Sequence, residues 1–252
     1  MTQRRPSFPA RIDLGSPPAR KASAPAGAPR MPSGIGLDSA AVRAVMVRKL
    51  AAQGIADPQV LAALGQVERH RFVDSALVNQ AYEDTSLPIG LGQTISKPNV
   101  VARMVELLLA APDRPAGPMG RVLEIGTGCG YQAAVLACVA REVYTIERLR
   151  GLHDKARDNL RPLRLAQVHL LFGDGMQGYP AGAPYAGIIA AAGGEAVPAA
   201  WTDQLAVGGR LVAPMVMPGG QQALVVIDRT PDGLRRQVLE AVHFVPLKSG
   251  TA

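Results

Sequence analysis

The chain has 252 residues, of which 48% are hydrophobic and 19% charged, so it can form a folded core and is not disordered throughout. Its two cysteines and four histidines, without metal-ligand spacing, exclude a disulfide scaffold and a zinc site, and no metal is expected. No run approaches the roughly 18 apolar residues needed to cross a bilayer, so no membrane partner is expected.

Residues 1–36 are predicted to form a disordered tail rich in proline, alanine and arginine. They hold seven of the 21 prolines, a spacing that interrupts both helices and central strands. They also carry +5 of the net charge of +7, so residues 37–252 are nearly neutral and no nucleic-acid partner is expected. A solvated tail is favoured over a nucleic-acid or membrane arm. No apolar segment follows Arg4-Arg5, so no signal peptide is predicted and the expected location is the cytoplasm.

The pattern of residues 37–115 predicts an N-terminal helical addition to the core, and this addition includes a candidate active-site segment. Apolar residues at helical spacing indicate helices over residues 42–50, 58–64 and 98–108. Gly54 ends the first helix and Asp57 caps the second. Residues 72–96 lack clear periodicity and suggest a structured loop, and residues 111–120 form a linker.

Residues 121–252 alternate between strands and helices and form the predicted core. Strands are expected over residues 122–125, 143–146, 168–171, 188–191 and 211–214, and helices over residues 131–139, 149–160 and 198–205. Two closing strands, 223–228 and 237–242, flank a turn at 230–233. This order predicts a Rossmann-like α/β sandwich, with a mostly parallel sheet, an antiparallel edge and the N-terminal helical addition.

A glycine loop follows the first core strand, with the sequence Glu124-Ile125-Gly126-Thr127-Gly128-Cys129-Gly130. Glycines let a ligand approach the backbone, and the next helix offers free N–H groups. Glu147 ends the following strand, 21 residues after Gly126, where a carboxylate can bind both ribose hydroxyls of a nucleoside. A tight turn without a ligand remains the alternative.

The spacing of this loop favours one nucleoside cofactor. G-x-G-x-G with an acid two residues earlier differs from the dinucleotide pattern G-x-G-x-x-G and resembles the S-adenosylmethionine loop of class I methyltransferases. Glu124 would then lie near the cationic methionine end. Asp174-Gly175 follow the third core strand, where an acid can bond the adenine amine, although a plain turn fits equally well.

A more specific resemblance lies in residues 81–98, Ala-Tyr-Glu-Asp-Thr-Ser-Leu-Pro-Ile-Gly-Leu-Gly-Gln-Thr-Ile-Ser-Lys-Pro. This segment closely resembles the one before the cofactor loop in the protein-L-isoaspartate O-methyltransferase family. The resemblance continues through residues 122–132, 143–148, 173–175, 204–209 and 245–247, and covers about residues 40–250. Other class I methyltransferases lack the Leu-Pro-Ile-Gly…Gln-Thr-Ile-Ser segment.

The resemblance implies an activity and assigns residues to it. The family transfers a methyl group from S-adenosylmethionine to the α-carboxylate of L-isoaspartyl residues in damaged proteins and peptides, leaving S-adenosylhomocysteine. It implies that Ser96 is the active-site residue and that Thr94 and Ile95 line the same site. Glu147 would hold the ribose, Asp174 and Gly175 would flank the adenine, and the protein would be a monomer.

The chemistry suits a serine. An isoaspartyl carboxylate is ionised at neutral pH, so no general base is required, and a hydroxyl can donate to one oxygen and aim the other. The alternative role for Ser96 is a helix N-cap before Pro98. Two other functions stay open: a methyltransferase for another carboxylate or a small molecule, and a noncatalytic cofactor-binding relative.

Overall fold

The structure is a computed structural model, and it describes residues 40–112 and 114–252. The predicted tail, residues 1–36, lies outside these residues. Among the described residues, none of the helices has the length and apolar character needed to span a membrane.

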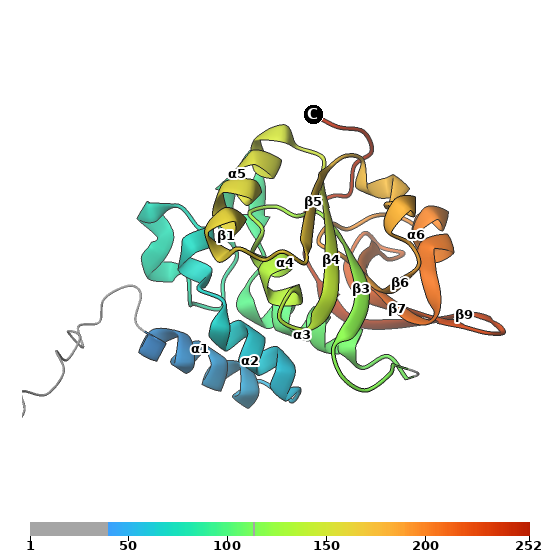
Figure 1. Cartoon of the computed structure of the whole chain (residues 1–252), viewed down its shortest axis with the longest axis horizontal. Coiled ribbons are helices and arrows are strands. Elements are labelled where there is room, and N and C mark those ends of the chain that lie inside the picture. The colour runs from blue at the N-terminus through green and yellow to red at the C-terminus, as the bar shows by residue number, and fades with distance from the viewer. Residues whose placement is uncertain (1–39, 113) are drawn as a thin grey trace, which may run out of the picture. The chain divides into compact units, whose positions relative to one another are not determined.

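The N-terminal part is built from three helices and a small hairpin (Figure 1). Its helices are α1 (Ala40–Ala52), α2 (Pro58–Gln66) and α3 (Pro98–Leu109). Asp57 caps α2 as predicted, because its carboxylate accepts hydrogen bonds from the backbone N–H groups of Gln59 and Val60. Two short 3₁₀ helices, Arg69–Phe72 and Ser75–Gln80, lead to the antiparallel strands β1 (Leu87–Gly90) and β2 (Gln93–Ile95).

The core is a seven-stranded sheet in the order β5-β4-β3-β6-β7-β8-β9. Its strands are β3 (Met119–Ile125), β4 (Ala140–Glu147), β5 (Val168–Phe172), β6 (Tyr185–Ala190), β7 (Leu205–Val216), β8 (Gln222–Thr230) and β9 (Gly233–Val242). The first five strands in this order, from β5 through β4, β3 and β6 to β7, pair in parallel. Strands β8 and β9 add an antiparallel edge next to β7. The predicted α/β sandwich, with a mostly parallel sheet and an antiparallel edge, is therefore confirmed.

Alternate residues of the strands face two separate hydrophobic cores. Val122 of β3 packs with α3 and with α4 (Tyr131–Leu136) and α5 (Arg150–Leu160) on one face. Leu123 packs on the other face, with Trp201 of α6 (Ala199–Gln204). Because β4 and β6 flank β3 on opposite sides, the loops after β3 and β6 diverge and leave a crevice at the carboxyl end of β3.

The structure corrects two local predictions, and it does not support the alternative role of Ser96 as the N-cap of α3. The expected loop 72–96 contains the hairpin β1–β2, whose register places Leu87 opposite Ile95, so its apolar side chains are buried together. The N-cap position of α3 is Lys97 and not Ser96, and the Asp84 carboxylate accepts a hydrogen bond from the N–H of Asn99 in its first turn. Helix α4 ends at Leu136, three residues earlier than predicted.

Candidate active site

A cavity of about 240 Å³ lies at the carboxyl ends of β3 and β4. Its walls come from the β1–β2 hairpin, the glycine loop, the start of α5 and a segment near the C-terminus. Eight of the predicted site residues line it: Thr94, Ile95, Ser96, Gly126, Thr127, Gly128, Glu147 and Gly175. The hairpin and the Rossmann-like core, which are far apart in sequence, therefore share one cavity.

The glycine loop packs closely against the hairpin and is hydrogen-bonded to the end of β4. Gly128 has a φ of +57°, and a Cβ there would lie 3.1 Å from Cδ1 of Ile89 in the hairpin. Glu147 is buried at the end of β4, where one carboxylate oxygen accepts from the N–H of Gly128 at 2.9 Å and the other accepts from the N–H of Leu149 at 2.9 Å. Glu147 thus ties the loop to the next strand while lining the cavity.

Glu124 lies beneath the loop and does not line the cavity. The Thr145 hydroxyl donates to its Oε2 at 2.5 Å, and the Thr127 hydroxyl lies 2.6 Å from that of Thr145. Its Oε1 and the Nε2 of Gln132 are also fully buried. Burial raises the pKa of Glu124 to about 8, against the opposing effect of hydrogen bonding with Thr145 and Gln132. The glycine loop therefore lies over a buried polar cluster that includes Glu124, Thr127 and Thr145.

Asp174 and Gly175 follow β5 but occupy different environments. One Asp174 oxygen accepts from the N–H of Met176, and the other accepts from the N–H of Gly250. Gly175 lines the cavity, and a Cβ there would lie 2.6 Å from Cγ2 of Ile125. Arg148 also binds the carbonyl oxygen of Gly250, at 2.8 Å. These bonds fasten the segment that follows Lys248, the last of the cavity-lining residues 245–248.

A second cavity of about 520 Å³ adjoins the first. The two share four lining residues: Thr94, Ser96, Ala191 and Val245. No described residue makes a hydrogen bond to the Ser96 side chain, which is half-buried. The opposite wall comes from the end of β9 and the residues after it, 240–245. Ser96 therefore lies where the two cavities meet.

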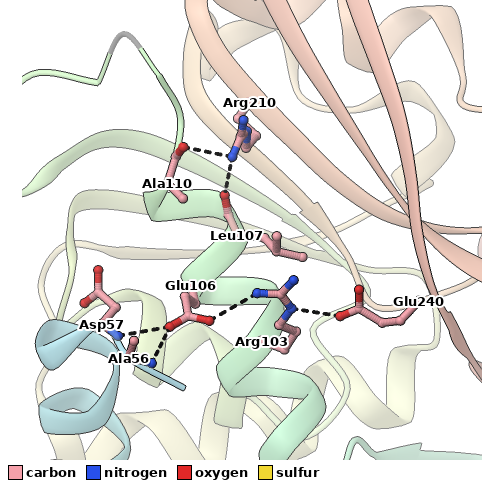
Figure 2. A network of polar contacts seen from close by, with 8 residues as sticks. All are labelled: Ala56, Asp57, Arg103, Glu106, Leu107, Ala110, Arg210 and Glu240. Atoms are coloured by element: carbon pink, nitrogen blue, oxygen red, sulfur yellow. Dashed lines mark hydrogen bonds and ion pairs between the residues drawn. The ribbon is translucent and has the colours of Figure 1, made fainter. Parts of the chain in front are cut away.

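A polar network fixes α3 beside the second cavity (Figure 2). Arg103 of α3 binds Glu106 at 3.2 Å and Glu240 of β9 at 2.8 Å. Glu106 also accepts from the backbone N–H groups of Ala56 and Asp57 before α2. At the other end of α3, Arg210 of β7 donates to the carbonyl oxygens of Leu107 and Ala110. The network joins α2, β7 and β9 to one helix.

Comparison with known proteins decides the family. The family model described as protein-L-isoaspartate(D-aspartate) O-methyltransferase matches residues 41–252. The chain belongs to this family. A protein-L-isoaspartate O-methyltransferase from Methylibium petroleiphilum is 58% identical, with 98% of this chain and 97% of that protein covered. One from Leptothrix cholodnii is 58% identical over 93% of this chain and 83% of that protein.

Solved structures of the same description agree with this fold. A protein-L-isoaspartate O-methyltransferase structure matches with a TM-score of 0.73 and 27% identity, over 82% of this chain and 66% of that chain. A Plasmodium falciparum structure in complex with S-adenosyl-L-homocysteine matches with a TM-score of 0.69 over 82% of this chain and 98% of that chain. Its identity is 23%, so this likeness concerns the fold.

The family resemblance located the first cavity better than the second. Glu124, Gly130 and Asp174 do not line the first cavity, and their contact with the cofactor stays a prediction. The sequence analysis missed Arg103 and Glu240, which line the second cavity. They lie 137 positions apart and belong to no local motif, so only the packing of α3 against β9 brings them together.

Proposed function

We propose that the first cavity binds S-adenosylmethionine, that the second binds the isoaspartyl segment of a damaged protein, and that Ser96 aligns the two. The activity follows from the family: transfer of a methyl group from S-adenosylmethionine to the α-carboxylate of L-isoaspartyl residues, as a repair reaction. The single observation that supports the assignment of the cavities is that Ser96 lines both.

The residues of the first cavity fit S-adenosylmethionine. Gly126 and Gly128 present backbone without side chains, as close approach of a ligand requires. Ile146 and Leu152 provide an apolar surface. When bound, S-adenosylmethionine supplies a methyl group already activated by its sulfonium centre.

The protein's own residues then have two tasks, neither of which is proton removal. The isoaspartyl carboxylate has a pKa of about 4 and is ionised at neutral pH, so no base is needed. The Ser96 hydroxyl donates a hydrogen bond to one carboxylate oxygen and leaves the other free to react. Ala191 and Val245, which also line both cavities, present apolar surface that excludes water around the reacting carboxylate.

The test measures methyl transfer from labelled S-adenosylmethionine to two peptides that differ only in isoaspartate against aspartate at one position. Labelling of the isoaspartyl peptide alone is the expected result. Ser96→Ala should lower kcat by about 10-fold or more, because a charge-assisted hydrogen bond contributes about 1.5–3 kcal/mol. Binding of S-adenosylmethionine to Ser96→Ala, followed by calorimetry, should change little.

Two results would count against this proposal. Full activity of Ser96→Ala would remove the role assigned to Ser96. If the wild-type protein bound S-adenosylmethionine but labelled neither peptide, the substrate would be another carboxylate or a small molecule. Thr202→Ala is the matched control, since among the described residues its hydroxyl bonds only to Ala199 within α6 and Thr202 lines neither cavity.

A further inference from the structure

We infer that Arg103 recognises an acidic side chain of the substrate, two or three residues from the isoaspartyl residue, and that Glu240 holds its place until the substrate arrives. This inference rests on the proposed function of the second cavity. It assigns a substrate preference to that cavity: damaged sites in acidic surroundings.

The charged residues of the second cavity are divided between its walls. Lys97 and Arg103 lie on the α3 side, and Glu240 lies on the β9 side. Lys97 approaches Asp84 only to 3.9 Å, so this ion pair is loose. The α3 wall therefore places two cationic groups in the lining, while the acids paired with them on that side, Asp84 and Glu106, lie outside the lining. Glu240 is the one acid among the described lining residues.

A substrate carboxylate could replace Glu240 on Arg103, because the ion pair between these two residues is partly exposed. The Arg103 side chain is 36% exposed and that of Glu240 is 44% exposed, so water screens this ion pair and it contributes little stability. Glu106, by contrast, is 13% exposed and already accepts two backbone N–H groups (Figure 2). If Glu240 moved away, Arg103 would keep its bond to Glu106 and its orientation toward the cavity.

A guanidinium group has donors in excess of those used here. In this structure Nε of Arg103 binds Glu240 and one terminal nitrogen binds Glu106. An arginine offers five N–H donors in a planar fork that matches a carboxylate. A substrate carboxylate can therefore replace Glu240 at Nε and use the remaining terminal nitrogen as well, which a single bond to Glu240 does not.

The distance along α3 sets the position of the acidic residue. Arg103 lies six residues after Lys97, the residue that follows Ser96, or about 9 Å along the helix axis at about 1.5 Å per residue. An extended chain advances about 3.3 Å per residue, so this span equals two or three substrate residues. With the isoaspartyl group at Ser96, a carboxylate at that separation can reach Arg103.

The experiment compares isoaspartyl peptides that carry Glu or Gln two or three residues away, on either side, with both ends blocked. The wild-type protein should prefer one Glu peptide about three- to tenfold in kcat/KM, through KM rather than kcat. The preference should shrink in high salt, because the pair is partly exposed. A peptide with neutral side chains and a free C-terminal carboxylate is the control that shows whether Arg103 recognises an acidic side chain or the carboxylate of a chain end.

Two substitutions should act in opposite directions. Arg103→Gln should abolish the preference for the Glu peptide, and Arg103→Lys should retain part of it. Glu240→Gln should increase the preference about twofold, because the competing carboxylate is gone. Arg121→Gln and Glu142→Gln are the matched controls, since that exposed ion pair has a similar length of 3.0 Å and lines neither cavity.

Equal use of Glu and Gln peptides by the wild-type protein would overturn the inference while leaving the proposed function intact. So would an equal loss of activity in Arg103→Gln and Glu240→Gln, which indicates that the pair only holds β9 against α3. A preference confined to the free chain end would replace the acidic side chain as the recognised group. Failure to methylate any isoaspartyl peptide would overturn the proposed function itself.

Discussion

At the scale of single residues, Glu124 makes folding stability depend on pH. Its pKa is 4.5 in the unfolded chain and about 8 in the folded protein, where burial disfavours the carboxylate. Between these values the folded state holds a proton that the unfolded chain has released. The free energy of unfolding should therefore fall as pH rises from about 5 to about 8, by up to about 1.4 kcal/mol per pH unit.

Urea unfolding of wild type and Glu124→Gln from pH 5 to pH 9 measures this effect. The amide has no proton to lose, so the variant should lack the decline and gain stability relative to wild type as pH rises. Glu142→Gln should keep the wild-type profile, because Glu142 is exposed on β4. Parallel profiles for wild type and Glu124→Gln would mean that Glu124 is ionised throughout the range.

The sequence predicts residues best where a motif is local. Gly126 and Gly128 lie where the strand–loop–helix pattern placed them, in the wall of the first cavity. The same pattern could not show that Glu124 points beneath the loop, because this depends on Thr145 of the neighbouring strand. Nor could it show that Asp174 already binds the backbone of Gly250, 76 positions away.

At the scale of elements, Arg210 fastens the C-terminal end of α3 to the sheet. Its guanidinium makes two hydrogen bonds to the Asp228 carboxylate, at 2.6 and 2.8 Å, besides those to Leu107 and Ala110. Arg210 is buried, so Arg210→Gln would leave a shielded carboxylate and two carbonyl oxygens unpaired. We expect a loss of about 3 kcal/mol in the free energy of unfolding, measured by urea titration.

The control for Arg210→Gln is Arg121→Gln, which breaks an exposed pair and should cost about 1 kcal/mol or less. Because Arg210 lines neither cavity, the folded fraction of Arg210→Gln should retain a near wild-type KM for S-adenosylmethionine. A loss of stability no larger than that of the control would show that solvent satisfies these groups.

The elements themselves were predicted unevenly, for a physical reason. Helix α3 and strands β3 and β4 carry strong apolar periodicity, and the structure confirms them. The β1–β2 hairpin has strands of only four and three residues, too short for an alternating pattern to emerge. It is ordered instead by burial of Leu87, Ile89 and Ile95 against the core, a tertiary effect.

At the scale of the whole molecule, the net positive charge is concentrated near the N-terminus of the sequence. Residues 1–36 carry most of the net positive charge, and within the part of the chain that the structure describes the residues lining the two cavities lie between positions 86 and 248. The family model likewise begins at residue 41. A variant lacking residues 1–36 should therefore keep kcat and KM for an isoaspartyl peptide within about twofold of wild type.

The same deletion should weaken the binding of the protein to polyanions. Removing +5 of the charge leaves residues 37–252 at +2, so retention on heparin should decrease and its salt dependence should weaken. Measuring methyl transfer and heparin retention on both wild type and the variant lacking residues 1–36 distinguishes a role of these residues in catalysis from a role in binding polyanions. A loss of methyl transfer to a short peptide would place residues 1–36 in the active site. A loss confined to large acidic protein substrates would instead assign them to electrostatic capture, since a short neutral peptide gains nothing from such steering.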